Sequence, residues 1–74
     1  MEAQRLVHMA NQIAAFFKAY PEPEAIAATA THIRDFWDPR MRQQLAALVT
    51  AGGDGLTPIA RKAALALGEP TPAP

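Results

Sequence analysis

The sequence predicts an all-α fold, a small bundle of three main helices with a short fourth helix near the C-terminus. Apolar residues recur at three- and four-residue intervals, prolines and glycines divide the chain into helical segments, and no alternating run of β-branched residues indicates a strand. A chain of 74 residues suffices for one domain. We expect this domain to span residues 1–68 and a flexible proline-rich tail to follow at residues 69–74.

The first helix is expected over residues 2–20, where the apolar side chains share one face. At about 100° per residue they form a stripe roughly 120° wide, as expected of a helix that faces a core. Pro21 and Pro23 end this helix, because proline lacks an amide hydrogen and clashes with the preceding turn. The stripe consists of Leu6, Met9, Ala10, Ile13, Phe16, Phe17 and Tyr20.

A second helix is expected from Pro23, which suits a first helical turn, while Glu22 and Glu24 suit the positive end of the helix dipole. Alanines make its first half thin, so another helix can approach closely, and its bulk lies at the end, in Phe36 and Trp37. Its stripe repeats the spacing of the first and consists of Ile26, Thr29, Ala30, Ile33, Phe36 and Trp37.

A third helix is expected to begin at Pro39, because Asp38 is a strong N-cap and proline fits the first helical position. Gly52 is expected to end it in a left-handed conformation. The same signal at Thr57-Pro58 predicts a short fourth helix through about Leu67. The alternative fold is a looser helical hairpin that becomes fully ordered only on a partner. We expect the core to contain Leu6, Ile13, Phe16, Ile26, Ile33, Phe36, Leu45 and Leu48.

The composition excludes several classes of protein. Seven basic and seven acidic side chains leave a formal net charge of zero, which argues against nucleic-acid binding and against a polybasic membrane surface. The chain has no cysteine, so disulfides and thiolate metal sites are excluded. The N-terminus lacks the pattern of a signal peptide, and no apolar stretch approaches the roughly 18 residues of a membrane span. We expect a soluble, cytoplasmic protein.

Catalytic and metal-binding chemistry is poorly represented. The chain has neither serine nor cysteine, and His8 and His32 lie on different predicted helices. His32, Asp35 and Asp38 are three residues apart, a spacing that turns about 60° round a helix at each step, so they do not converge on one ion. The glycines at 52–55 lack the lysine and the preceding strand of a phosphate-binding loop. We therefore expect no catalytic, cofactor-binding or metal-binding residue.

The segment from His32 to Arg42 is the most distinctive part of the chain, with the only tryptophan and three of the five arginines. Arginines bordering aromatic residues are typical of interface hot spots, because arginine pairs bidentately with carboxylates. Two alternatives stay open. In the first, the arginines form only a solvated surface and Arg34 pairs with Asp38. In the second, Trp37 belongs to the core. The predicted partner-binding residues are Arg34, Trp37, Asp38, Pro39, Arg40 and Arg42.

Two other function classes remain open from the residues alone. The third helix begins with arginines and glutamines, which read bases in helix-turn-helix regulators, although a net charge of zero leaves little capacity for phosphate binding. A self-associating helical module is the other alternative, since small domains often need a partner to be stable.

Three motifs resemble the delta subunit of soluble, NAD-dependent, molybdenum-containing formate dehydrogenase. The first is Met9-Ala10-Asn11-Gln12-Ile13-Ala14 followed by Phe16-Phe17. The second is His32-Ile33 leading into Phe36-Trp37-Asp38-Pro39-Arg40-Met41-Arg42. The third is Gly55-Leu56 with Pro58 before the last helix. The resemblance spans about residues 6–67, and its middle motif is the most specific.

This resemblance implies a non-catalytic accessory subunit, or an assembly and maturation factor, without a cofactor of its own. Proteins of this kind accompany a catalytic alpha subunit that holds a bis-molybdopterin guanine dinucleotide cofactor and iron–sulfur clusters. Beta and gamma subunits carry FMN and further clusters. The expected partner is therefore the catalytic alpha subunit, with the six predicted partner-binding residues as the docking surface. Self-association of the isolated chain is left open.

Overall fold

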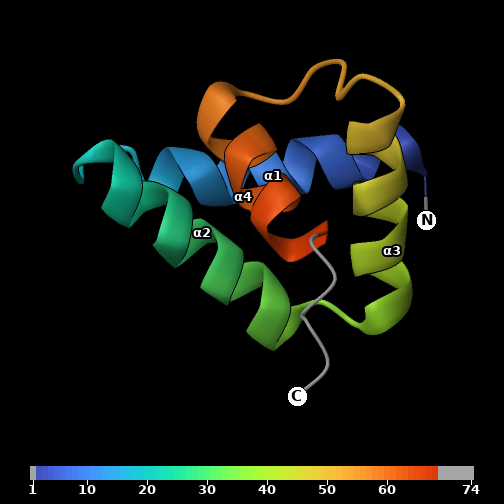
Figure 1. Ribbon diagram of the computed structural model, residues 1–74, viewed down its shortest axis with the longest axis horizontal. Helices are drawn as coiled ribbons and strands as arrows, with labels where there is room; N and C mark the ends of the chain where they lie inside the picture. The colour runs from blue at the N-terminus through green and yellow to red at the C-terminus, as the bar shows by residue number, and fades with distance from the viewer. Residues whose placement is uncertain (1, 69–74) are drawn as a thin grey trace.

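The computed structural model describes residues 2–68 and shows four α-helices: α1 (Ala3–Phe17), α2 (Glu22–Phe36), α3 (Pro39–Thr50) and α4 (Pro58–Gly68). No strand occurs within this range, so the all-α prediction is confirmed. The predicted tail at residues 69–74 lies outside the described part of the chain. Figure 1 shows α4 lying over α1 and α2 beside α3, and α4 packs most extensively against α2.

The ends of the helices follow local chemistry. Pro23 lies in the first turn of α2 together with Glu22 and Glu24, as predicted. The first helix ends at Phe17, three residues before the predicted end, and the Tyr20 N–H then donates to the Phe17 carbonyl over 3.0 Å. Pro21 explains the early end, because it has no N–H to donate to the carbonyl of Phe17, four residues earlier, and its ring clashes with that carbonyl.

The C-terminal end of α3 is closed by the glycine pair, as the sequence predicts. The Gly53 N–H donates to the Leu48 carbonyl over 2.9 Å, and the Gly52 N–H donates to the Val49 carbonyl over 3.0 Å. Gly52 has a φ of 124°, which side-chain-bearing residues rarely adopt. This pair of hydrogen bonds is the Schellman arrangement, which satisfies carbonyls that the helix itself leaves without partners.

Replacing Asp38 with alanine is expected to lower the free energy of unfolding by about 1 kcal/mol. The Asp38 carboxylate accepts a hydrogen bond from the Met41 N–H over 2.9 Å, and alanine would leave that amide to water. Urea unfolding followed by circular dichroism measures the loss, and Asp38→Asn, which also caps well, serves as the control. Equal stability of the alanine variant and the wild type would contradict this role of the cap.

The core agrees only in part with the predicted one. Leu6, Ile33 and Leu45 are almost completely buried, as predicted, whereas Phe16 is 79% exposed and Phe36 is 75% exposed. Those two predictions are wrong. The other predicted core residues, Ile13, Ile26 and Leu48, are half-buried. The buried apolar cluster instead adds Ala10, Ala14, Trp37, Leu56, Ala60 and Ala64.

The buried stripe of α1 explains the error at Phe16. Its centre lies on Leu6, Ala10 and Ala14, which follow one another at four-residue intervals. At 100° per residue, Phe16 lies about 120° round the helix from Ala10. The apolar face of α1 is therefore wider than the part that the core covers, because neighbouring helices approach closely where the side chains are small.

Small residues also line the contact between α2 and α4. The structure confirms that alanines keep the first half of α2 thin enough for close approach by another helix, and α4 is that helix. The buried Thr29 hydroxyl donates to the Ala25 carbonyl over 2.7 Å, so burial leaves this polar group satisfied. An exposed ion pair between Lys62 and Glu22 also joins the two helices. The buried small residues are Ala25, Thr29 and Ala30 of α2 and Ala60, Ala63 and Ala64 of α4.

Candidate functional site

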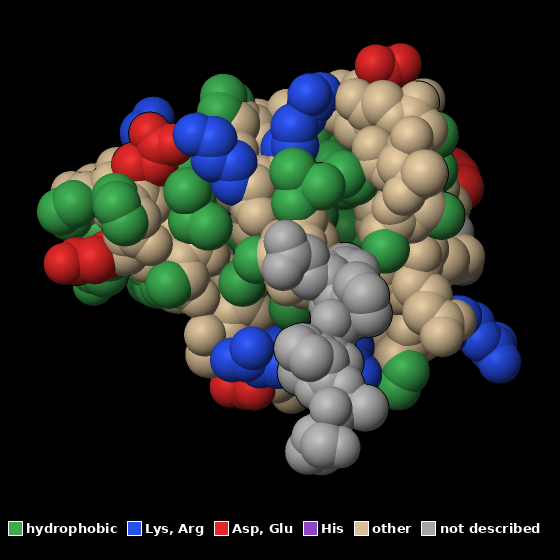
Figure 2. Space-filling view, in the orientation of Figure 1, with side chains coloured by type: hydrophobic (Ala, Val, Ile, Leu, Met, Phe, Trp, Pro, Cys, Tyr) green, Lys and Arg blue, Asp and Glu red, His purple; other side chains and the backbone are tan. Residues whose placement is uncertain are grey.

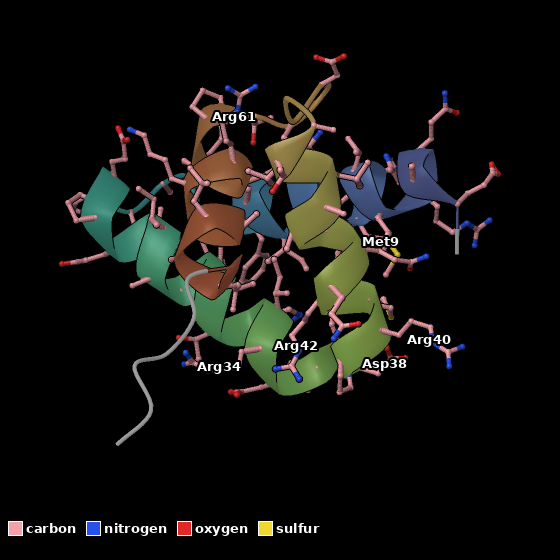
Figure 3. The ribbon with its side chains drawn as sticks, turned by 45° about the vertical axis from the view of Figure 1, so that its right-hand side comes forward. Met9, Arg34, Asp38, Arg40, Arg42 and Arg61 are labelled. Atoms are coloured by element: carbon pink, nitrogen blue, oxygen red, sulfur yellow. The ribbon has the colours of Figure 1, made fainter. Side chains whose placement is uncertain are left out.

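The predicted docking residues surround the junction between α2 and α3. The Trp37 N–H still donates to the Ile33 carbonyl over 2.9 Å, but Trp37 itself is extended, with φ −92° and ψ 140°. The next helix begins at Pro39, so the chain changes direction within two residues. Figure 3 shows Arg34, Asp38, Arg40 and Arg42 around this junction.

Trp37 lies beneath this surface, because the extended backbone turns its ring inward. The residue is 6% exposed and belongs to the buried cluster with Ile33 and Leu45. This burial corrects the expectation that Trp37 offers its ring to a partner, and favours the alternative that it belongs to the core. Trp37 therefore lies beneath the other predicted docking residues and is not exposed with them.

The three arginines are spread along the junction. Arg34 donates to the Thr31 hydroxyl over 3.3 Å, and the half-buried Arg42 donates to the Arg34 carbonyl over 3.5 Å. Arg42 thus adds a positive charge at the C-terminal end of α2, where the helix dipole favours one. Arg40 is exposed and points away from the other two in Figure 3. Their guanidinium groups do not converge on one point.

The ion pair between Arg34 and Asp38, which one alternative included, does not form in the described part of the chain. Within residues 2–68 the only salt bridge joins Lys62 and Glu22. The Asp38 carboxylate instead accepts from the Met41 backbone, which explains why it does not reach Arg34. Figure 2 likewise shows basic side chains at several separate places on the face in view.

Two residues hold the loop between α3 and α4, and the sequence did not predict either role. The Asn11 side chain donates to the Gly55 carbonyl over 2.8 Å and accepts from the Thr57 N–H over 2.9 Å. Arg61 donates to the carbonyl of Gly52 over 2.9 Å and to that of Gly53 over 3.4 Å. The spacing of residues within α1 could not reveal the Asn11 contacts, because its partners lie 44 and 46 residues away in the sequence.

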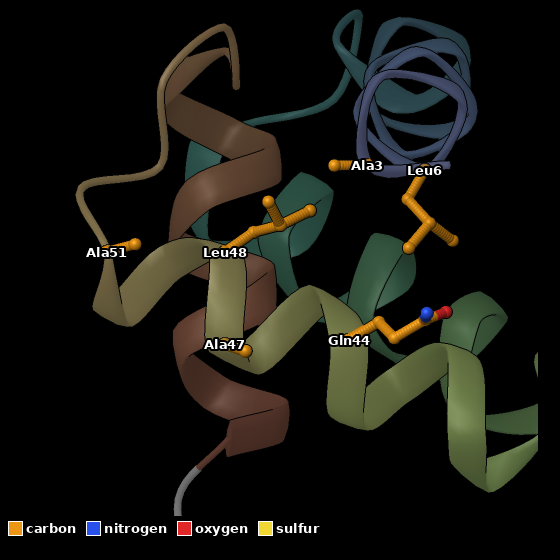
Figure 4. Close-up of a pocket in the computed structure, with 6 residues that line it drawn as sticks. All are labelled: Ala3, Leu6, Gln44, Ala47, Leu48 and Ala51. Atoms are coloured by element: carbon orange, nitrogen blue, oxygen red, sulfur yellow. The ribbon is translucent and has the colours of Figure 1, made fainter. Parts of the chain in front are cut away.

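An open groove of about 250 Å³ lies between the N-terminal half of α1 and α3. In Figure 4, Leu6 of α1 and Leu48 of α3 extend into the space between the two helices, and Gln44 of α3 lies below Leu6. The lining side chains carry no charge and no nucleophile, so the groove lacks the groups that catalysis needs. The lining consists of Ala3, Leu6, Gln44, Ala47, Leu48 and Ala51.

The described residues also lack a metal site. Within residues 2–68, no group of three histidine, cysteine, aspartate or glutamate side chains could hold a metal ion. None of the helices in the same range is both long enough and apolar enough to cross a membrane.

A comparison with protein-family models found one match. The model of the NADH-dependent formate dehydrogenase delta subunit FdsD matches residues 5–64, more than three quarters of the chain. The chain belongs to the FdsD family. This match confirms the resemblance drawn from the three motifs. Neither the search of curated proteins nor the search of solved structures found a match.

The matched region of this FdsD-family chain contains the α2–α3 junction, the Asn11 contacts and the loop that they hold. It ends within α4, at residue 64. A delta subunit of formate dehydrogenase forms a complex with other subunits of that enzyme. The exposed surfaces of the domain are therefore candidates for contact with those subunits.

Proposed function

We propose that this chain is a non-catalytic accessory subunit that assists the assembly or maturation of a cytoplasmic, NADH-dependent formate dehydrogenase. It docks on the catalytic alpha subunit. The match to the FdsD family over residues 5–64 carries the proposal. In this proposal the molybdenum cofactor, the iron–sulfur clusters and FMN belong to the other subunits, and this chain supplies a contact surface.

We further propose the α2–α3 junction as one docking surface, which we call the arginine surface: Arg34, Asp38, Pro39, Arg40 and Arg42. Four of these residues are exposed, and Arg42 is half-buried. Neither Arg40 nor Arg42 forms an ion pair within residues 2–68, so both charges are available to carboxylates of a partner. Asp38 and Pro39 start α3 and so set the direction in which these arginines leave the backbone.

The double variant Arg40→Ala, Arg42→Ala is expected to weaken binding to the catalytic subunit by about tenfold or more for each arginine. Its melting temperature should stay close to that of the wild type, because exposed arginines add little to stability and the Arg42 hydrogen bond is long. Co-purification of the tagged chain with the catalytic subunit measures binding, and circular dichroism measures melting.

Arg5→Ala provides the matched control, since Arg5 is an exposed arginine of α1 outside the arginine surface. If the double variant melts like the wild type and still co-purifies fully, the arginine surface is only solvated. If the wild type binds no subunit of the enzyme, the proposed function is wrong. Retention of the wild type on DNA that falls with salt would instead favour a DNA-binding regulator.

A further inference from the structure

A second surface of this domain, on α1 and α2, exposes aromatic rings that the core does not use. We call it the aromatic face: Phe16, Phe17, Tyr20, His32 and Phe36. Phe16, Phe36 and Tyr20 are 79%, 75% and 53% exposed. Exposed aromatic residues in a cluster are unusual on a soluble domain and mark sites of contact more often than single exposed apolar residues do.

The aromatic face is continuous. The rings of Phe16 and Phe17 meet edge to face with centroids 5.0 Å apart, and Phe17 lies 6.0 Å from Tyr20. On α2, the rings of His32 and Phe36 lie 4.6 Å apart. Phe17 and His32 both line two neighbouring hollows of about 270 and 390 Å³, so they connect the two groups of rings.

The chemistry of the two hollows describes what they can hold. The first is lined by Gln12, Ile13 and aromatic side chains, and it has no Asp, Glu, Lys or Arg. The lining of the second includes small residues of α2, among them Ala27 and Ala28, and its single Asp, Glu, Lys or Arg side chain is Asp35. Asp35 forms no ion pair within residues 2–68. A complementary partner therefore presents bulky apolar side chains and one basic side chain opposite Asp35.

The area of the aromatic face argues against a second copy of the chain as its occupant. At the roughly 200 Å² that an aromatic side chain presents, the three exposed rings offer on the order of 400 Å². A standard interface buries about 800 Å² on each partner, so two copies meeting through this face alone would fall well short of a stable dimer. Phe36 ends α2 two residues before Asp38, so the aromatic face and the arginine surface meet at the junction.

We propose that the aromatic face binds an apolar helix of another formate dehydrogenase subunit, whose side chains fill the two hollows and whose basic residue pairs with Asp35. This inference rests on the proposed function and adds to it the surface that supplies most of the apolar contact. A helix laid into a groove with bulky anchors at three- and four-residue spacing is a common mode of recognition, and buried aromatic anchors contribute most of its affinity.

The test uses the double variant Phe16→Ala, Phe36→Ala with formate dehydrogenase purified from cells that lack this chain. Biolayer interferometry with the immobilised chain measures affinity. The double variant is expected to bind about 30-fold or more weakly than the wild type. Its melting temperature is expected to change little, because both rings are exposed and alanine is a good helix former. Leu65→Ala, an exposed apolar residue of α4, is the control and should bind like the wild type.

Wild-type affinity of the Phe16→Ala, Phe36→Ala variant would overturn this inference. If the Arg40→Ala, Arg42→Ala variant lost affinity in the same assay, the proposed function would still hold without this inference. Light scattering should show the isolated wild-type chain as a monomer. A wild-type dimer that the aromatic variant converts to a monomer would mean that a second copy covers the face, and would also overturn the inference. Absence of any binding by the wild type would remove the proposed function and this inference together.

Discussion

Replacing Trp37 with alanine is expected to destabilise the domain by about 3–5 kcal/mol. The ring is 6% exposed and packs in the cluster that contains Ile33 and Leu45, so its removal leaves a cavity in the centre of a small core. Domains are stable by only about 5–15 kcal/mol, and a domain of this length lies toward the lower end, so much of the chain is expected to unfold near 37 °C.

Phe36→Ala is the matched control for this prediction. Phe36 is the preceding residue and also carries an aromatic ring, but it is 75% exposed. Its replacement should change the free energy of unfolding by only about 0.5 kcal/mol. Urea unfolding of the two variants, followed by circular dichroism, compares them directly. Similar losses for both variants would contradict the placement of Trp37 in the core and Phe36 on the surface.

Replacing Ala63 with leucine is expected to cost about 1–3 kcal/mol, the usual cost of overpacking a core. Ala63 is fully buried on α4, the helix that packs most extensively against α2. The larger side chain has no space there unless the helices move apart. For a domain of this size, such a loss lowers the melting temperature by about 4–8 °C for each kcal/mol.

Ala66→Leu tests whether burial causes this effect. Ala66 lies on the same helix but is exposed, and leucine has nearly the helix propensity of alanine. Its melting temperature should therefore stay close to that of the wild type. Thermal unfolding followed by circular dichroism measures both variants. An Ala63→Leu variant as stable as Ala66→Leu would show that α2 and α4 do not need small residues between them.

The sequence indicated which residues lie at the α2–α3 junction but not how their side chains are arranged. The sequence identified the arginines and the Asp38 cap, because their spacing and chemistry are local. It did not predict that Arg42 reaches the Arg34 carbonyl, and it left open whether Trp37 belongs to the core. Each of these depends on the angle between α2 and α3, which the residues of the junction alone do not specify. The contacts of Arg61 could not be predicted for a similar reason, since the carbonyls that accept its hydrogen bonds lie on the loop after α3.

Local signals in the sequence were enough to locate most helix ends, although α1 ends three residues earlier than predicted. The Asp38 cap, the prolines at helix starts and the glycines after α3 act through hydrogen bonds and steric contacts within a few residues, so they can be recognised one segment at a time. Membership of the FdsD family was also evident from the motifs.

Only the tertiary structure decided which apolar side chains are buried. The sequence showed wide apolar stripes on both helices of the first pair, and the largest residues in them indicated the core. The helices instead pack closely through alanines, and this close packing leaves Phe16 and Phe36 outside. Burial depends on which part of a stripe another helix covers. This contact joins segments distant in the chain, so the spacing of apolar residues within one helix cannot specify it.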